Sequence, residues 1–353
     1  MNIELSKLKG LLKKLSCVKA ETIILDTHNG VLCAREGNLS VYVINEILKD
    51  PTAVDGIHFF PAKKFLPSVN RMSGTLTIRK MDNYYSLVSN KTRIELDIFE
   101  QPWKFDLHLT TDTAIKTSAL QNIVQFVQIA SDPKQDAMSF AGLISLRGHE
   151  DFIDGSRIEA VATDGKRMAV MSEETTSSNL DVLMPTSLVS VISQLDGELT
   201  YIQDSANFVM LHSNGLVAVA NKFNGNFPNA TAYFPEVYDF KVNVNPAEFL
   251  EALGRIQPMV NEDSRSMGIE YKNGSIVMST AGSGGTGKDE IPYTGQEHEY
   301  KAMFDHKFLA DFFSTIKDSD EPVTICHKKD KQFLVFKHGE KQYLIANMVS
   351  TKK

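Results

Sequence analysis

The sequence predicts an α+β protein built from three repeated domains, each an antiparallel sheet with two helices. Three observations support this prediction. A strand–helix–hairpin pattern occurs three times, a strand–helix pattern precedes each copy, and most other segments alternate apolar and polar residues as strands do. The copies recur at a period of about 120 residues, which indicates one folding unit used three times. Such an array is expected to be curved and to wrap around another molecule.

The strand–helix pattern comes first in each copy, at residues 3–18, 113–130 and 240–260. Apolar residues recur there at helical spacing, which predicts a helix packed on one face. The predicted buried stripes are Leu8, Leu11, Leu12, Leu15 and Val18, then Leu120, Ile123, Val124 and Val127, then Phe249, Leu250, Leu253 and Ile256. Ser6 and Asn245 are the predicted N-caps of the first and third helices.

The strand–helix–hairpin pattern follows at residues 59–90, 183–214 and 303–339. Each copy has a short apolar strand and then a helix that opens on Pro-Ala, Pro-Thr or Asp-His. Two strands with period-2 alternation come next, as at residues 75–79 and 208–212. The pairs Asn214-Gly215 and Asn273-Gly274 predict tight turns.

Domain boundaries are expected near residues 108–112 and 236–240, which gives domains at 1–110, 111–238 and 239–353. No Gly/Ser-rich linker separates these domains. Rigid packing between neighbouring domains is therefore expected.

The 353-residue chain is 42% apolar and 23% charged, as ordinary globular proteins are. It contains no apolar run of about 18 residues, and its N-terminus lacks the pattern of a signal peptide. Its three cysteines are too few and too scattered for a disulfide framework or a zinc site. A reducing cytoplasm is the expected location, and no metal or other cofactor is expected.

The net charge of −7 argues at first against a nucleic-acid partner. Positive charge nevertheless gathers on the first helices, whereas acidic residues gather in the hairpins and near the C-terminal ends of helices. The second-copy helix is rich in glutamine on its polar face, and the third carries Arg255. A weakly basic face that tolerates DNA is one interpretation of this distribution, and an ordinary solvated face is the other.

One segment matches a phosphate-binding pattern, because residues 282–288 read GSGGTGK. Asp289 follows where a hydroxyl should hold magnesium, and Pro292 prevents the helix that such a loop must open. A flexible hairpin loop is therefore the preferred interpretation. The nine histidines show no catalytic spacing, so an enzyme is not expected. An ATPase that uses Lys288 stays as an alternative, which a nucleotide-binding titration would decide.

Four segments carry a family resemblance. They read PAKKF at residues 61–65, EAVATDGKRMAVMS at 159–172, FNGNFPNATAYFP at 223–235 and YLIANM at 343–348. With these segments the chain resembles the bacterial DNA polymerase III beta subunit, the beta sliding clamp, and phage-encoded relatives of that clamp. The specific part is a Thr-Asp-Gly turn followed about 60 residues later by Gly-x-Phe-Pro. The correspondence covers essentially the whole chain.

The resemblance implies a DNA clamp fold, in which two chains of three domains form a homodimeric ring with helices lining the hole. It implies a processivity factor that encircles double-stranded DNA, slides without reading sequence and tethers the DNA polymerase. A clamp-like scaffold that binds only proteins is the alternative. The residues expected to face DNA are Lys7, Lys9, Lys13, Lys14, Lys63, Lys64, Arg71, Arg255 and Lys317.

The resemblance also implies an apolar pocket that grips a short peptide from polymerases and the clamp loader. Its expected residues are Phe140, Thr163, Gly165, Lys166, Arg167, Met168, Pro228, Tyr233, Leu344, Ile345 and Met348. Core packing is the alternative interpretation for the apolar members. Ala346-Asn347 stands where the family commonly has Met-Pro, and residues 349–353 run past the usual end, so a different peptide preference is expected. Met168→Asp is expected to abolish peptide binding without unfolding the ring.

The implied ring contact joins the first domain of one chain to the third domain of the other. Ile94, on a predicted edge strand, is one expected interface residue. Ile256, Met259 and Val260, at the end of the third-copy helix, are the others.

Overall fold

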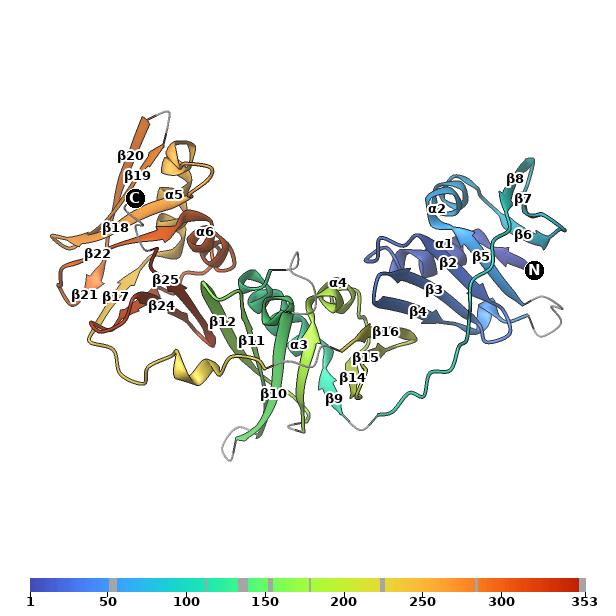
Figure 1. The fold of residues 1–353 in the computed structure, drawn as a ribbon, viewed down its shortest axis with the longest axis horizontal. Helices are drawn as coiled ribbons and strands as arrows, with labels where there is room; N and C mark the ends of the chain where they lie inside the picture. Colours follow the sequence, from blue (N-terminus) through green and yellow to red (C-terminus); the bar gives the residue numbers. More distant parts are fainter. Residues whose placement is uncertain are drawn as a thin grey trace. The chain divides into compact units, whose positions relative to one another are not determined.

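The computed structural model describes residues 1–50, 56–111, 113–132, 139–151, 155–177, 179–222, 226–282 and 285–348 (Figure 1). The chain divides into two compact units. The first comprises Met1–Gln121 and Thr175–Asn224, and the second comprises Asn122–Glu174 and Gly225–Lys353. The expected three-domain division is a different partition and stays a prediction.

The first unit contains two antiparallel sheets. The smaller, in spatial order, is β1 (Asn2–Glu4), β6 (Thr75–Lys80), β7 (Tyr84–Ser89) and β8 (Thr92–Asp97). The larger, in spatial order, is β5 (Ile57–Pro61), β2 (Thr22–Asp26), β3 (Val31–Glu36), β4 (Leu39–Ile44), β16 (Leu216–Asn221), β15 (Phe208–Ser213), β14 (Leu199–Asp204) and β9 (Ala114–Lys116). Strand β8 is therefore an edge strand.

The second unit also contains two antiparallel sheets. Its larger sheet runs β10 (Leu143–Asp151), β11 (Gly155–Thr163), β12 (Arg167–Glu174), β25 (Lys341–Ala346), β24 (Phe333–His338), β23 (Val323–His327), β17 (Phe240–Val244) and β21 (Thr294–Gly295). Its smaller sheet runs β20 (Gly285–Pro292), β19 (Ser275–Gly282), β18 (Ser266–Lys272) and β22 (Tyr300–Asp305). Strand β20 is an edge strand.

Short helices connect these strands. The α-helices are α1 (Leu5–Lys14), α2 (Ala62–Arg71), α3 (Thr117–Val127), α4 (Val189–Ile192), α5 (Pro246–Ile256) and α6 (His306–Ser314). The 3₁₀ helices are Glu46–Leu48, Gln128–Ala130, Phe140–Gly142, Thr186–Leu188, Ala230–Ala232 and Gln257–Met259. Within the described residues, none of the helices has the length and apolar character needed to cross a membrane.

The structure confirms the predicted fold class and the repeated order of elements. The strand–helix–hairpin copies are β5–α2–β6–β7, then β13 (Asp181–Pro185)–α4–β14–β15, then β22–α6–β23–β24. The strand–helix copies are β1–α1, β9–α3 and β17–α5. The second copy deviates in one element, because its second helix is reduced to a 3₁₀ turn and the four residues of α4.

Caps and turns are predicted correctly where they depend only on neighbouring residues. Asn245 caps α5, and its side-chain oxygen accepts a hydrogen bond from the Glu248 amide at 3.1 Å. Asn214-Gly215 and Asn273-Gly274 form hairpin turns with positive φ at both positions, as two-residue turns of this kind require. The Ser6 cap is wrong. Helix α1 begins at Leu5, whose amide donates to the Gly74 carbonyl at 2.9 Å.

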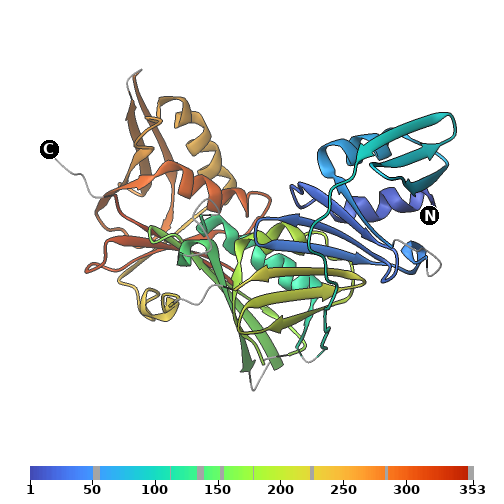
Figure 2. The same ribbon diagram turned by 45° about the vertical axis from the view of Figure 1, so that its right-hand side comes forward.

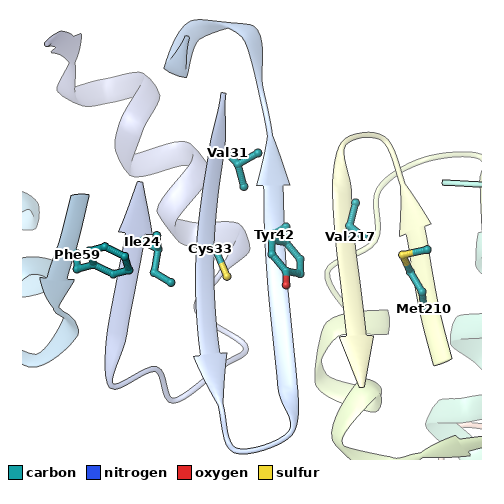
Figure 3. Close-up of a cluster of buried hydrophobic side chains, with 7 residues drawn as sticks. All are labelled: Ile24, Val31, Cys33, Tyr42, Phe59, Met210 and Val217. Atoms are coloured by element: carbon teal, nitrogen blue, oxygen red, sulfur yellow. The ribbon is translucent and has the colours of Figure 1, made fainter. Parts of the chain in front are cut away.

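Each large sheet carries an apolar cluster that a connecting segment covers. In the first unit the cluster spans neighbouring strands and consists of Ile24, Val31, Cys33, Tyr42, Phe59, Met210 and Val217 (Figure 3). Phe99, Trp103, Phe105 and Leu107 of the following segment pack against it. The Trp103 indole also donates to the Asp26 carboxylate at 2.9 Å, which fixes the segment to β2.

Candidate functional site

The turn between β11 and β12 is held in one conformation by its own side chains. The Thr163 hydroxyl donates to the Arg167 carbonyl at 2.6 Å and accepts from the Gly165 amide at 3.1 Å. One oxygen of Asp164 accepts from the amides of Lys166 and Arg167 at 2.9 and 3.1 Å. Gly165 has φ +85°, which a residue with a Cβ rarely adopts. The turn is therefore preformed and partly exposed.

Arg167 ties this turn to helix α6. Its Nε lies 2.9 Å from Asp164 Oδ2, and its Nη1 lies 2.7 Å from Asp311 Oδ2. The guanidinium carbon sits 4.0 Å from the centre of the Phe308 ring. The side chain is buried, so both ion pairs are largely shielded from water.

The register of β12 and β25 divides the predicted pocket between two faces of the sheet. Met168 pairs with Leu344, and Arg167 pairs with Ile345. Neighbouring residues of a strand point to opposite faces, so each pair occupies its own face. Because Arg167 contacts α6, Ile345 lies on the helix side and Met168 and Leu344 lie on the other. The four residues expected in one pocket therefore lie on two faces of the sheet, and the assignment of Arg167 and Ile345 to a peptide site stays a prediction.

The face with Met168 carries an apolar cluster, here called the Met168 cluster. It consists of Val161, Met168, Val170, Tyr238, Cys326, Val335 and Leu344. Figures 1 and 2 show the yellow segment before β17 on the side of β24 and β25 away from α6. Phe227, Ala230 and Phe234 of this segment pack on the cluster. Phe227 and Phe234 are not among the residues predicted from the sequence, because their only signal is their apolar character within a segment without strand alternation.

Burial of the Met168 cluster changes how the pocket can work. Met168 is 4% exposed and Leu344 is 6% exposed, whereas Tyr233 on the covering segment is 47% exposed. A carboxylate at this position would be buried in apolar surroundings, so the burial of Met168 leads us to expect that Met168→Asp destabilises the fold, contrary to the expectation from the sequence.

The remaining pocket residues lie around the turn. A Cβ added to Gly165 would lie 3.8 Å from the Phe140 ring, so Phe140 stands against the turn. The Lys166 carbonyl accepts from the Ala346 amide at 2.9 Å, which joins the turn to the end of β25. Met348 and Pro228 are half-buried. All predicted pocket residues belong to the second unit. Those that are exposed are Gly165, Lys166 and Tyr233.

The nine predicted DNA-facing residues fall into two groups. Five are engaged by the chain itself: Lys7 with Glu4 at 3.3 Å, Lys9 with backbone carbonyls, Lys14 with Asp196 at 2.8 Å, Lys64 with Asp97 at 3.9 Å, and Arg255 with Asp289 at 2.6 Å. No ion pair in the described ranges involves the other four, which are the exposed cations Lys13, Lys63, Arg71 and Lys317. These four are available to a polyanion without breaking an existing pair.

Lys9 has a structural role that its neighbour Lys13 lacks. Its ammonium donates to the carbonyls of Asn70 and Met72 at 3.0 and 2.7 Å, at the C-terminal end of α2. Lys9→Met is therefore expected to lower the free energy of unfolding by about 1 kcal/mol. Lys13→Met is expected to change it by less than about 0.5 kcal/mol. Urea unfolding of both variants checks this, and equal losses would contradict it.

The predicted dimer-contact residues are not equally available. Ile94 is half-buried on edge strand β8, as expected. Met259 is exposed, and Val260 is half-buried. Ile256 is only 3% exposed, because the end of α5 packs on β20, where a Cβ at Gly287 would lie 3.2 Å from Ile256. Ile256 therefore belongs to the core of its own unit, which corrects its assignment to a surface contact.

The glycine-rich segment does not form a phosphate-binding loop in its described part. Residues 285–288 lie in β20, paired with β19, and no helix follows them. Ser283 and Gly284, which the predicted loop includes, lie outside the described residues. The Asp289 carboxylate, which accepts a hydrogen bond from Arg255, has its pKa lowered by that bond and stays ionised. A negative charge at this place repels phosphate.

Comparison with known proteins finds relatives of this chain by sequence. No protein-family model matches the chain. It is 24% identical over 308 residues to the beta sliding clamp of Haemophilus influenzae, covering 84% of this chain and 82% of that relative. It is 25% identical over 224 residues to the beta sliding clamp of Staphylococcus epidermidis, a match that spans 60% of this chain and 57% of that relative. These matches confirm the resemblance to beta sliding clamps.

Solved structures extend the likeness to the whole fold. The DNA polymerase III subunit beta of Pseudomonas aeruginosa has a TM-score of 0.84 at 16% identity, covering 99% of both chains. The clamp of Bartonella birtlesii bound to griselimycin has a TM-score of 0.84 at 18% identity, again over 99% of both chains. The DNA polymerase III beta subunit of Thermotoga maritima has a TM-score of 0.83 at 16% identity. The chain therefore has the fold of these proteins from end to end.

Proposed function

We propose that this chain, a relative of the beta sliding clamps, is itself a DNA sliding clamp. Two copies would close into a ring around double-stranded DNA and hold the polymerase on it as a processivity factor. The observation that carries the proposal is the threefold repeat of strand, helix and hairpin within a fold shared over 99% of the chain with DNA polymerase III beta subunits. Its mechanism is topological, so it needs neither catalysis nor a cofactor. Its place of action is the cytoplasm of a bacterial cell, including a cell infected by a phage that encodes it.

The ring we propose has six domains, three from each chain, with the boundaries expected from the sequence at residues 1–110, 111–238 and 239–353. Within the described part of the chain, edge strands β8 and β20 each pair with one neighbouring strand, and an exposed edge is a template for pairing with another chain. A head-to-tail contact between β8 of one chain and β20 of the other would cover both edges and bring Ile94 near Met259. Such a head-to-tail contact joins two different surfaces. Repeated contacts of this kind form a closed ring only if the rotation from each chain to the next brings the last chain back to the first.

DNA binding in this proposal rests on few charges. Lys13, Lys63, Arg71 and Lys317 lie on or beside the helices and have no ion pair in the described ranges. Each phosphate that they neutralise contributes about 0.9 to the slope of log affinity against log salt. Lysine ammonium groups bind phosphate as mobile point charges, which suits sliding better than a fixed fork does. A net charge of −7 keeps the remaining surface unfavourable to DNA.

The polymerase contact we propose starts at the open part of the predicted pocket. Gly165 and Lys166 are exposed, and Tyr233 offers an exposed ring on the segment that covers the buried Met168 cluster. An apolar side chain of a bound peptide would bury the most surface if the segment carrying Phe227 and Phe234 shifted and admitted it to this cluster. Griselimycin, which binds the relative from Bartonella birtlesii, is the available probe for this surface.

The test of the ring uses DNA topology. The purified chain is loaded on nicked circular DNA and then followed by gel filtration before and after the circle is cut. We expect retention on the circle and complete release from the linear form. A closed ring cannot leave a circle without opening, whereas it slides off the free ends of linear DNA. Equal retention on both forms would contradict the ring and leave ordinary electrostatic binding.

The matched variants for this test are Ile94→Asp and Ile47→Asp. Ile94 lies on the proposed contact edge, whereas Ile47 is an exposed isoleucine in the 3₁₀ helix Glu46–Leu48, which belongs to neither edge strand. Light scattering should give a dimer for the wild type and for Ile47→Asp, and a monomer for Ile94→Asp, which should also not be retained on circles. A wild-type monomer at micromolar concentration would contradict the proposed ring.

A clamp-like scaffold that binds only proteins is the second candidate, favoured by one observation. Five of the nine predicted DNA-facing cations are engaged by neighbouring groups of the chain itself. A scaffold would form the dimer and bind griselimycin without any retention on circular DNA.

A further inference from the structure

Two histidines lie in an aromatic cage in the second unit, between the larger sheet and the smaller one. We call it the histidine cage, and its members are Phe240, Tyr271, His298, Tyr300 and His327. His298 stacks on Phe240 with ring centres 4.1 Å apart and planes 4° from parallel. His327 lies 6.0 Å from His298, and Tyr300 meets His327 edge-on at 4.3 Å. Tyr271 meets His298 edge-on at 4.9 Å, so aromatic rings surround the imidazole pair.

The imidazoles have almost no hydrogen bonds. Within the described residues, His298 Nε2 and His327 Nδ1 are buried and without a hydrogen-bond partner. His298 Nδ1 is 3.3 Å from the Gln296 carbonyl, which is a weak contact. Buried polar atoms are normally paired, so this pair is held by ring packing in its neutral form. Adding a proton to either ring would place a charge in apolar surroundings.

The charged groups around the cage do not offset that cost. Asp239 is exposed and binds the Lys329 backbone amide, and the Lys329 ammonium lies 5.1 Å above Phe240. Other titratable groups on the neighbouring strands and loop are Lys241, Glu270, Tyr293, Glu297, Glu299, Lys301 and Cys326. Burial lowers the pKa of both histidines. For His327 the neighbouring His298 lowers the pKa further, and Asp239 acts in the opposite direction.

Water can reach the cage from one side. An open cavity of about 750 Å³ is lined by His298, Tyr271, Tyr293 and Tyr300 together with residues of the loop before β22. Protons therefore have a path to the imidazoles once the packing loosens.

The cage also holds the end of β25. The Tyr300 hydroxyl, beside His327, donates to the Asn347 side-chain oxygen at 3.1 Å. The Met348 amide donates to the carbonyl of Met303, which lies in the same strand β22, at 2.7 Å. Strand β22 thus anchors the two residues that follow β25. Leu344 of the Met168 cluster lies in β25 itself.

We propose that the histidine cage is a proton-sensitive latch, which opens in mildly acidic solution and releases Asn347 and Met348 from β22. The closed form keeps both imidazoles neutral, whereas the open form exposes them to water and lets them bind protons. The end of β25, and with it one side of the Met168 cluster, is consequently ordered at neutral pH and loosened in acid.

The direction of the effect follows from proton linkage. An exposed histidine titrates near pH 6.5, and the closed form holds both pKa values below that. The open form therefore binds more protons, so the closed form is fully stable above about pH 7 and loses stability as the pH falls below about 6.5. Each histidine shifts the opening equilibrium by at most tenfold per pH unit in that window.

The test measures amide hydrogen exchange of residues 341–348 by mass spectrometry at pH 7.5 and 5.5, with rates corrected for intrinsic exchange. The wild type should lose protection at this segment by roughly tenfold or more at pH 5.5, and helix α3 should keep its protection. The double variant His298→Phe and His327→Phe should show no such loss, because phenylalanine keeps the ring packing and binds no proton. His108→Gln, at an exposed histidine, is the matched control and should behave as the wild type does.

Equal loss of protection in the wild type and the double variant would overturn the latch, and so would unchanged protection of the wild type at pH 5.5. A second measurement serves if the double variant does not fold. Proton NMR titration of the wild type should give pKa values below the ordinary one for both His298 and His327. Ordinary or raised values would overturn the proposal. Neither measurement depends on DNA or polymerase binding, so the latch can fail while the clamp proposal stands.

Discussion

Replacing Arg167 with methionine is expected to lower the free energy of unfolding by about 3–5 kcal/mol. The substitution removes the buried cation that pairs with Asp164 and Asp311 at 2.9 and 2.7 Å. Asp311 keeps Lys307 at 2.8 Å, but Asp164 loses its only ion pair within the described residues. The Phe308 ring also loses the guanidinium 4.0 Å from its centre. Urea unfolding of the purified variant measures the loss.

Lys307→Met is the matched control for Arg167→Met. Both residues pair with Asp311, but the Lys307 side chain is exposed and the pair is of the i, i+4 helical kind. Such pairs contribute about 0.3–0.5 kcal/mol, so Lys307→Met should remain close to the wild type. Losses of the same size in both variants would mean that the depth of Arg167 does not matter, and the account of this network would be wrong.

Met168→Ala is expected to lower the free energy of unfolding by about 2–5 kcal/mol, as truncations of buried large side chains do. Met168 lies in the Met168 cluster under the segment with Phe227 and Phe234, so its removal leaves a cavity. Met168→Leu keeps the volume and should lose less than about 1.5 kcal/mol. Met81, which is exposed in the first unit, is the matched control, and Met81→Ala should change stability by less than about 0.5 kcal/mol.

Griselimycin titration separates packing from binding at Met168. Calorimetry should show binding to the wild type and to Met168→Leu, and strongly weakened binding to Met168→Ala at a temperature where that variant is folded. Undiminished binding by folded Met168→Ala would remove the Met168 cluster from the proposed peptide site. The stability prediction would be unaffected, because it depends only on burial.

Much of the fold could be predicted because the signals that specify it are local. The stripe of Leu8, Leu11 and Leu12 recurs at helical spacing and is buried in α1 as expected. The pairs Asn214-Gly215 and Asn273-Gly274 adopt positive φ because few other residues tolerate it. The Ser6 cap failed since the first amide of α1 bonds to Gly74, a residue far along the chain.

The candidate site could be predicted only in part. The turn from Thr163 to Met168 was found through its resemblance to a family motif, and its hydrogen bonds explain why Gly165 stands there. Strand alternation alone places Arg167 and Met168 on opposite faces, although it does not say which face a peptide would meet. The partners Asp311 and Phe308 are more than 140 residues away, and nothing in the local sequence points to them.

Periodicity along the chain was sufficient to specify the threefold order of elements and the positions of the helix stripes, and Pro292 was sufficient to exclude a phosphate-binding helix after Lys288. These features depend on residues within a few positions of one another, where backbone geometry alone sets the neighbours. Contacts between distant strands decided the rest: Met168 is covered, Arg255 and Lys14 are already paired, Ile256 is core, and two histidines share a cage. Burial and ion pairing are properties of side chains that meet only after the chain has folded, so no window of sequence contains them.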